Sequence, residues 1–182
     1  MNYRVLQNPI TDEYLEFKRF VLSDSFPWYY KPSTTYVQEG YSANYIYSHK
    51  ILVGPSAMDG SYIPTSNSDS NLLAIGQKVV EQILKSNNIA FKHIYRMVCN
   101  TVYYSDGIPS VPHIDHPDFF HKNLIVYLTQ FEYGNIDVYD DDGTMCTYKP
   151  NEDEALTFDF KKHSINQPIG RDRRVAFVAT YS

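Results

Sequence analysis

The sequence predicts an α+β fold that is mainly β, a jelly roll supported by N-terminal helices. Helical patterns occur only in the first half of the chain, and six short strand-like runs separated by turn signals follow after residue 90. Aromatic residues make up 15% of the chain, including 17 tyrosines, which is typical of β-rich proteins. We expect one domain over residues 1–182, with a helical and aromatic support and lid region in 1–90 and the jelly-roll core in 91–182.

Two helices are expected in the N-terminal half. Residues 11–22 begin with Thr11, a suitable N-cap, and continue with acidic residues and an apolar stripe of helical period. Residues 70–86 carry a second apolar stripe. An aromatic, strand-like region lies between the first helix and about residue 52, and the turn-rich stretch 54–70 is expected to be a mobile lid.

Six runs of β-branched and aromatic residues predict the strands of the jelly roll. Short turn-rich segments connect them, so antiparallel pairing is expected. The runs are residues 95–104, 123–129, 135–140, 144–150, 155–160 and 173–181.

Composition excludes several classes of function. The net charge of −5 argues against a general nucleic-acid binder. No run approaches the ~20 apolar residues of a membrane span, and the N-terminal segment has no signal-peptide pattern. The only two cysteines, Cys99 and Cys146, do not form a secreted disulfide framework, which favours a cytoplasmic protein.

The segment VPHIDHPDFFHKNLIVYL carries the main chemical signal. His113 and Asp115 are separated by one residue, so on an extended chain their side chains point the same way. His163 follows a strong strand and is the best third candidate among six histidines. Two histidines and one carboxylate facing a metal are the ligand set of non-heme Fe(II) oxygenases. The plain alternative is a polar loop rich in histidine, and His116 and His121 are expected to be loop or supporting groups.

A basic cluster, GRDRRVAFV, lies about ten residues after His163. An arginine at the head of an apolar strand suggests a bound anion, because a guanidinium matches a carboxylate with two parallel hydrogen bonds.

With these motifs the chain resembles the Fe(II)/2-oxoglutarate-dependent oxygenases of the prolyl 4-hydroxylase-like branch, particularly small members from tailed phages of marine bacteria. HID, the later HSINQP and RRVAFV are similar to the family's HxD…H…R motif, and NLIVYL to its strand after HxD. The resemblance covers the chain from about residue 21. It implies a double-stranded β-helix of cupin-like type, and the cytoplasm of an infected host if the protein is phage-encoded. It also implies Fe(II), 2-oxoglutarate and O2 as cofactors, with ascorbate as a stimulatory reductant.

The resemblance also implies roles for individual residues. His113, Asp115 and His163 would bind iron, and Tyr127 with an arginine would hold the distal carboxylate of 2-oxoglutarate. Arg174 is favoured because the small Ala176 would then face inward beside the cosubstrate, and Arg173 is the alternative. Tyr103 matches a position near the metal and cosubstrate, and it is otherwise a core tyrosine.

The implied activity is hydroxylation of a substrate with release of succinate and CO2. The substrate stays open: a prolyl or other peptidyl residue, or a small metabolite. Two other classes remain. One is a cupin-like hydrolase or isomerase using another metal at the same ligands, and the other is a non-catalytic jelly-roll binding module.

Overall fold

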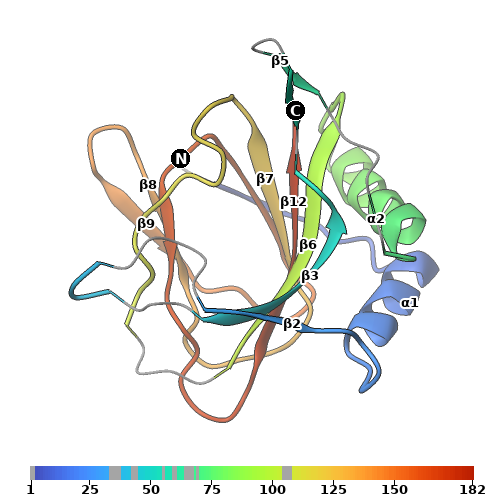
Figure 1. The fold of residues 1–182 in the computed structure, drawn as a ribbon, viewed down its shortest axis with the longest axis horizontal. Coiled ribbons are helices and arrows are strands. Elements are labelled where there is room, and N and C mark those ends of the chain that lie inside the picture. Colours follow the sequence, from blue (N-terminus) through green and yellow to red (C-terminus); the bar gives the residue numbers. More distant parts are fainter. Residues whose placement is uncertain are drawn as a thin grey trace.

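A computed structural model describes residues 3–32, 38–41, 45–54, 56–58, 61–63, 68, 70–103 and 108–182 (Figure 1). Within these residues the chain forms two helices and twelve strands, and all strand pairs are antiparallel. The helices are α1 (Asp12–Val21) and α2 (Leu73–Ser86). The strands are β1 (Arg4–Leu6), β2 (Tyr29–Lys31), β3 (Ile46–Leu52), β4 (Ser56–Met58), β5 (Ser61–Ile63), β6 (Ile94–Val102), β7 (Lys122–Tyr127), β8 (Ile136–Tyr139), β9 (Met145–Tyr148), β10 (Ala155–Asp159), β11 (His163–Ile165) and β12 (Arg174–Tyr181).

The predicted jelly roll is confirmed. A seven-stranded sheet with the order β1-β10-β7-β12-β6-β3-β2 faces a smaller sheet with the order β11-β8-β9 (Figure 1). Two isolated bridges, Pro109 to Asn166 and His113 to His163, add the segment 109–113 to the smaller sheet beside β11. The two sheets therefore enclose an interior. Strands β6, β7 and β12 of the larger sheet face it on one side, and strands β8 and β11 of the smaller sheet face it on the other.

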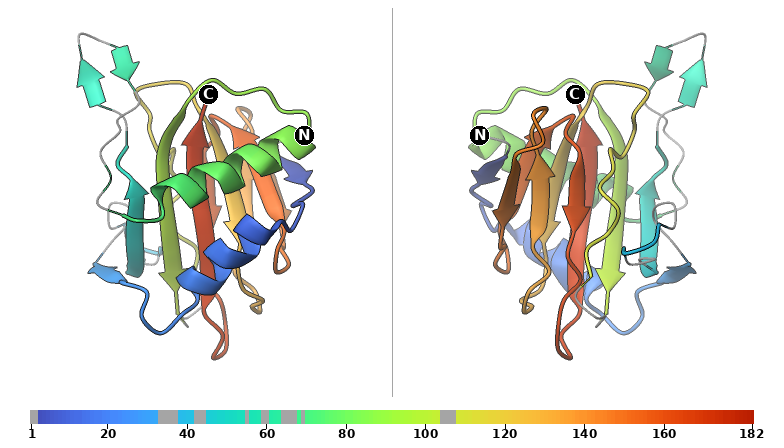
Figure 2. Two further views of the ribbon diagram at one scale, coloured as in Figure 1. Left: turned by 90° about the vertical axis from the view of Figure 1, so that its right-hand side faces the viewer. Right: turned by 90° about the vertical axis from the view of Figure 1, so that its left-hand side faces the viewer.

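Both helices lie across the outer face of the seven-stranded sheet, as Figure 2 shows. Thr11 caps α1 as expected, because its hydroxyl accepts a hydrogen bond from the Tyr14 N–H. Tyr14, Phe17 and Val21 form the buried face of this helix. The second helix begins at Leu73, three residues later than expected, because residues 70–72 form a turn in which the Leu73 N–H donates to the Ser70 carbonyl. Neither described helix has the length and apolar character that crossing a membrane requires.

Side chains of strand β12 contribute to two apolar cores, one on each face of the seven-stranded sheet. Val175 and Phe177 pack into the core beneath the helices, whereas Ala176 contributes to the core between the two sheets. This alternation follows from the two-residue period of a strand. Because Arg174 shares the phase of Ala176, its side chain points into the interior of the jelly roll.

The six predicted strand runs correspond to β6, β7, β8, β9, β10 and β12, and the aromatic region contains β2 and β3. Strands β1 and β11 were not predicted, because three residues are too few to show a period. The stretch 54–70, expected to be a lid, contains the β4–β5 hairpin. Its residues 55, 59–60, 64–67 and 69 lie outside the described residues.

Candidate metal centre

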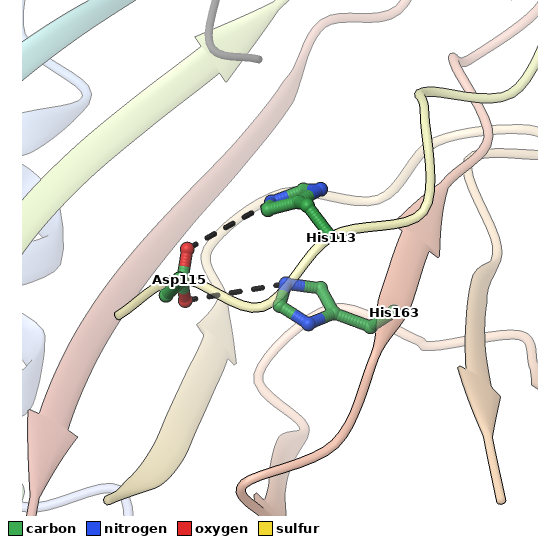
Figure 3. A group of neighbouring side chains, drawn as sticks. All are labelled: His113, Asp115 and His163. Atoms are coloured by element: carbon green, nitrogen blue, oxygen red, sulfur yellow. Dashed lines mark ion pairs between the residues drawn. The ribbon is translucent and has the colours of Figure 1, made fainter. Parts of the chain in front are cut away.

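His113, Asp115 and His163 come together in the interior of the jelly roll (Figure 3). The backbone bridge places the two histidines directly opposite each other: the backbone N–H of each donates to the backbone carbonyl of the other at 2.9 Å. Their ring centroids are 4.6 Å apart. Asp115 Oδ1 lies 3.8 Å from His113 Nε2, and Asp115 Oδ2 lies 4.0 Å from His163 Nε2. All three ligand atoms lie within 4.8 Å of one another, and among the described residues no other group of three does so.

The hydrogen bonds of both histidines leave the correct nitrogen free for a metal. His113 Nδ1 donates to the Val111 carbonyl at 2.9 Å, and His163 Nδ1 donates to the Lys161 carbonyl at 3.2 Å. A carbonyl oxygen can only accept, so in a neutral ring the proton sits on Nδ1 and the Nε2 lone pair is exposed. Both Nε2 atoms face Asp115, which is the arrangement a bound metal requires.

The electrostatics of this group favour the metal-binding protonation states. Burial alone would raise the pKa of Asp115, but the neighbouring His163 and Arg96 lower it to about 2. Burial lowers the pKa of His163 to about 4, although Asp115 opposes this change. At neutral pH the carboxylate is therefore charged and His163 is neutral, so binding of a divalent cation need not displace a proton from either.

A second polar group lies in the same interior. Arg174 lines the cavity and is only 4% exposed, and its Nε and Nη1 atoms have no hydrogen-bond partner. Its guanidinium carbon lies 5.6 Å from the centroid of the Tyr127 ring and 5.9 Å from that of Phe131. The Tyr127 hydroxyl is also buried and makes no hydrogen bond of standard geometry, and burial raises its pKa to about 12 although the adjacent Arg174 opposes this change. Burial lowers the pKa of Arg174.

No carboxylate among the described residues lies within ion-pair distance of Arg174. A buried and unpaired cation costs several kcal/mol. Together with the Tyr127 hydroxyl, it forms a donor set that an incoming carboxylate or phosphate would satisfy. The cavity therefore brings together three side chains that could bind a metal ion and a buried arginine that could bind an anion.

The remaining candidates from the sequence lie elsewhere. Arg173 points away from the cavity, and its Nη2 donates to the Leu22 carbonyl at 3.4 Å. Tyr103 is 44% exposed, does not line the cavity, and packs its ring against Tyr47. His121 is fully buried outside the metal group, and its Nδ1 donates to the Phe119 carbonyl.

The cavity that holds the three ligands has a volume of about 190 Å³. Its wall includes five polar residues that were not singled out from the sequence: Lys31 on β2, Arg96 and Asn100 on β6, and Ser110 and Gln167. Arg96 and Asn100 alternate with apolar residues in an otherwise buried strand, a signal that could have indicated a polar interior face. Lys31 gave no such signal, because its three-residue strand is too short for a pattern.

No family model and no curated protein matches this chain. Solved structures do match it along its full length. An oxidoreductase of the 2OG-Fe(II) oxygenase family from Burkholderia pseudomallei superposes with a TM-score of 0.70 at 14% identity, over 100% of this chain and 85% of that one. A Trichoplax adhaerens prolyl hydroxylase in complex with a hypoxia inducible factor oxygen degradation domain peptide fragment gives 0.63 at 14% identity, over 99% and 83%.

A third match is the epimerase SnoN in complex with Fe3+, alpha ketoglutarate and nogalamycin RO, with a TM-score of 0.62 at 14% identity, over 99% of this chain and 78% of that one. At such low identity the similarity defines the fold. This chain has the double-stranded β-helix fold found in 2OG-Fe(II) oxygenases. Its structural neighbours include enzymes that act on peptides and on small molecules, so the fold does not identify the substrate.

Proposed function

We propose that this protein is an Fe(II)- and 2-oxoglutarate-dependent dioxygenase of the prolyl 4-hydroxylase-like type. His113, Asp115 and His163 would hold Fe(II), and Arg174 with Tyr127 would bind the distal carboxylate of 2-oxoglutarate. The observation that carries the proposal is Arg174, a buried cation with two unpaired nitrogens in the wall of the cavity that holds the metal group. A metal-dependent hydrolase or isomerase that uses no 2-oxoglutarate would need the three ligands but would leave this buried cation without a counter-ion.

The residues fit both groups. Two neutral imidazoles and one carboxylate suit Fe(II) and leave coordination positions open. The unpaired Nε and Nη1 of Arg174 are free to donate hydrogen bonds to an incoming carboxylate, and the Tyr127 hydroxyl can donate another. The small Ala176, two residues along β12, lines the same cavity and leaves room beside the guanidinium.

With iron and 2-oxoglutarate bound, such a site couples oxidative decarboxylation to succinate and CO2 with hydroxylation of a substrate C–H bond by O2. The protein's own part in this is physical. The carbonyls of Val111 and Lys161 hold the two imidazole rings in the ligating tautomer. Apolar groups of Ile125 and Val178 line the cavity and limit access of water.

An anaerobic spectroscopic titration tests this function without knowledge of the substrate. Purified protein is mixed with Fe(II), and 2-oxoglutarate is added while the visible spectrum is recorded. A weak charge-transfer band from the Fe(II)–2-oxoglutarate chelate is expected in the wild type and absent in His163→Ala. His121→Ala, which changes a buried histidine outside the metal group, is the matched control and should keep the band. Iron binding without a band would favour a metal-dependent hydrolase or isomerase, and absence of iron binding a non-catalytic binding module.

A further inference from the structure

Two cations share the cavity wall with the metal group. Lys31 comes from the edge strand β2 and Arg96 from β6, and both line the same cavity as His113 and His163. Arg96 Nη1 lies 3.9 Å from Asp115 Oδ1, at the limit of an ion pair. These two side chains are not part of the arginine–tyrosine pair that serves 2-oxoglutarate in the proposed function.

The strand register explains why these cations lie on one face. Lys31 pairs with Ile46, and both line the cavity. Lys50 shares this face, since it lies four residues after Ile46 on β3. On β6, Arg96 lies six residues before Val102, which lines the cavity. Because side chains alternate along a strand, Arg96 faces the cavity as well.

The positive charges on this face are poorly compensated. No carboxylate among the described residues lies within ion-pair distance of Lys31. Burial, with Lys50 and Arg96 as neighbouring positive charges, lowers the pKa of Lys31. Asp115 is the only carboxylate among the described residues lining the cavity, and it belongs to the metal group. The arrangement costs stability in the unliganded protein, as binding sites for anions commonly do.

The charge balance of the loaded site leaves these cations unneutralised. The two positive charges of Fe(II) and the one of Arg174 equal the three negative charges of Asp115 and 2-oxoglutarate. Lys31 and Arg96 then carry two further positive charges at the wall of this cavity, and both side chains are partly buried. In such an environment an anion is attracted much more strongly than at an open surface.

We propose that the substrate is a small molecule with an anionic group, a carboxylate or a phosphate, that binds between Lys31 and Arg96 while its reacting carbon faces the metal. This proposal rests on the proposed function and names the substrate class of the same site. A small molecule is favoured because Lys31 and Arg96 line the same cavity as the metal group, so an anionic group held by them lies close to the reacting centre. Lys31 would act as a specificity residue, remote from the iron ligands in sequence.

The test measures anion binding to protein already loaded with Fe(II) and stoichiometric 2-oxoglutarate under anaerobic conditions, so that Arg174 is occupied. Acetate, inorganic phosphate and uncharged acetamide are titrated by calorimetry. Four proteins are compared: the wild type, Lys31→Glu, Lys31→Arg and Lys85→Glu. Lys85 lies on α2, outside the jelly roll, and its side chain is 70% exposed, so it is a control with the same change of charge. Arg96 is left intact because it contacts Asp115.

We expect acetate or phosphate to bind the wild type and acetamide not to bind. Lys31→Glu should weaken anion binding by at least about tenfold, whereas Lys31→Arg and Lys85→Glu should stay close to the wild type. The preferred anion identifies the chemical group. Equal affinities in Lys31→Glu and wild type, or no binding of either anion, would overturn the proposal while the charge-transfer band persists. Binding of an acidic hexaglutamate peptide but of neither small anion would overturn it in favour of a peptide substrate. Absence of the band in the wild type would instead mark failure of the proposed function itself.

Discussion

Replacing Arg174 by methionine should change cosubstrate binding and protein stability in opposite directions. The side chain is 4% exposed, has two unpaired nitrogens, and lies among Tyr127, Phe131 and Ala176. Methionine has a similar length, is apolar, and adapts to irregular space. The substitution therefore removes a buried charge without leaving a large cavity.

The magnitudes follow from the burial of the guanidinium. Truncating one partner of a buried, hydrogen-bonded charge pair costs about 2–4 kcal/mol, so 2-oxoglutarate should bind roughly 30- to 900-fold more weakly. In the cosubstrate-free protein the same change relieves the desolvation of an unpaired cation. The free energy of unfolding should rise by about 1–3 kcal/mol.

Two assays follow these quantities separately. Anaerobic titration of the Fe(II)-loaded protein with 2-oxoglutarate gives the affinity, and urea unfolding of the metal-free protein gives the stability. Arg173→Met is the matched control, because Arg173 is the next residue and points away from the cavity. If Arg173→Met weakens cosubstrate binding and Arg174→Met does not, the assigned strand phase is wrong. A large loss of stability in Arg174→Met would show that the guanidinium is structural rather than kept for a ligand.

Four further outcomes are expected. Asp115→Ala should abolish Fe(II) binding in anaerobic equilibrium dialysis, because it removes the only carboxylate of the metal group. Tyr127→Phe should weaken 2-oxoglutarate by about 1 kcal/mol, roughly fivefold, with little change in Fe(II) affinity. Gly134→Ala should lower the free energy of unfolding in urea by about 1–3 kcal/mol, since Gly134 has φ +65° and an added Cβ would lie 2.8 Å from the Phe131 ring. Between pH 6.5 and 4, His163 alone should lower the stability of the metal-free wild type by on the order of 3 kcal/mol, because the unfolded chain binds a proton at His163 that the folded chain, with a pKa of about 4, does not; His116 and His121, whose pKa values are also lowered by burial, add to the fall. His163→Gln, measured by the same urea unfolding, should show less of this dependence.

The metal group could be predicted from the sequence because its chemistry is local. His113 and Asp115 share one short segment, and His163 follows a strand whose pattern is clear. Arg174 could be placed from the alternation of large and small residues along β12, and the structure has its side chain in the cavity. In each case a few neighbouring residues contain the necessary information.

The other residues depend on how distant strands pair. Lys31 reaches the cavity only because β2 pairs with β3 and β3 with β6, and no local pattern determines this register. Tyr103 was expected near the metal from family resemblance. Val102, the last residue of β6, faces the cavity, so the alternation of the strand directs the next side chain outward.

The two sides of the cavity differ in how firmly their strands are held in the sheet. Arg174 belongs to a strand that is hydrogen-bonded on both sides, to β6 and β7, and is backed by the core beneath the helices. Lys31 belongs to a three-residue strand at the edge of the same sheet, and among the described residues this strand pairs on one side only. Amides around Arg174 should exchange only with global unfolding, and those of β2 through local opening. If the proposed roles hold, substitutions on the edge should alter what the protein accepts without disturbing how it holds 2-oxoglutarate, which makes β2 the natural starting point for redirecting specificity.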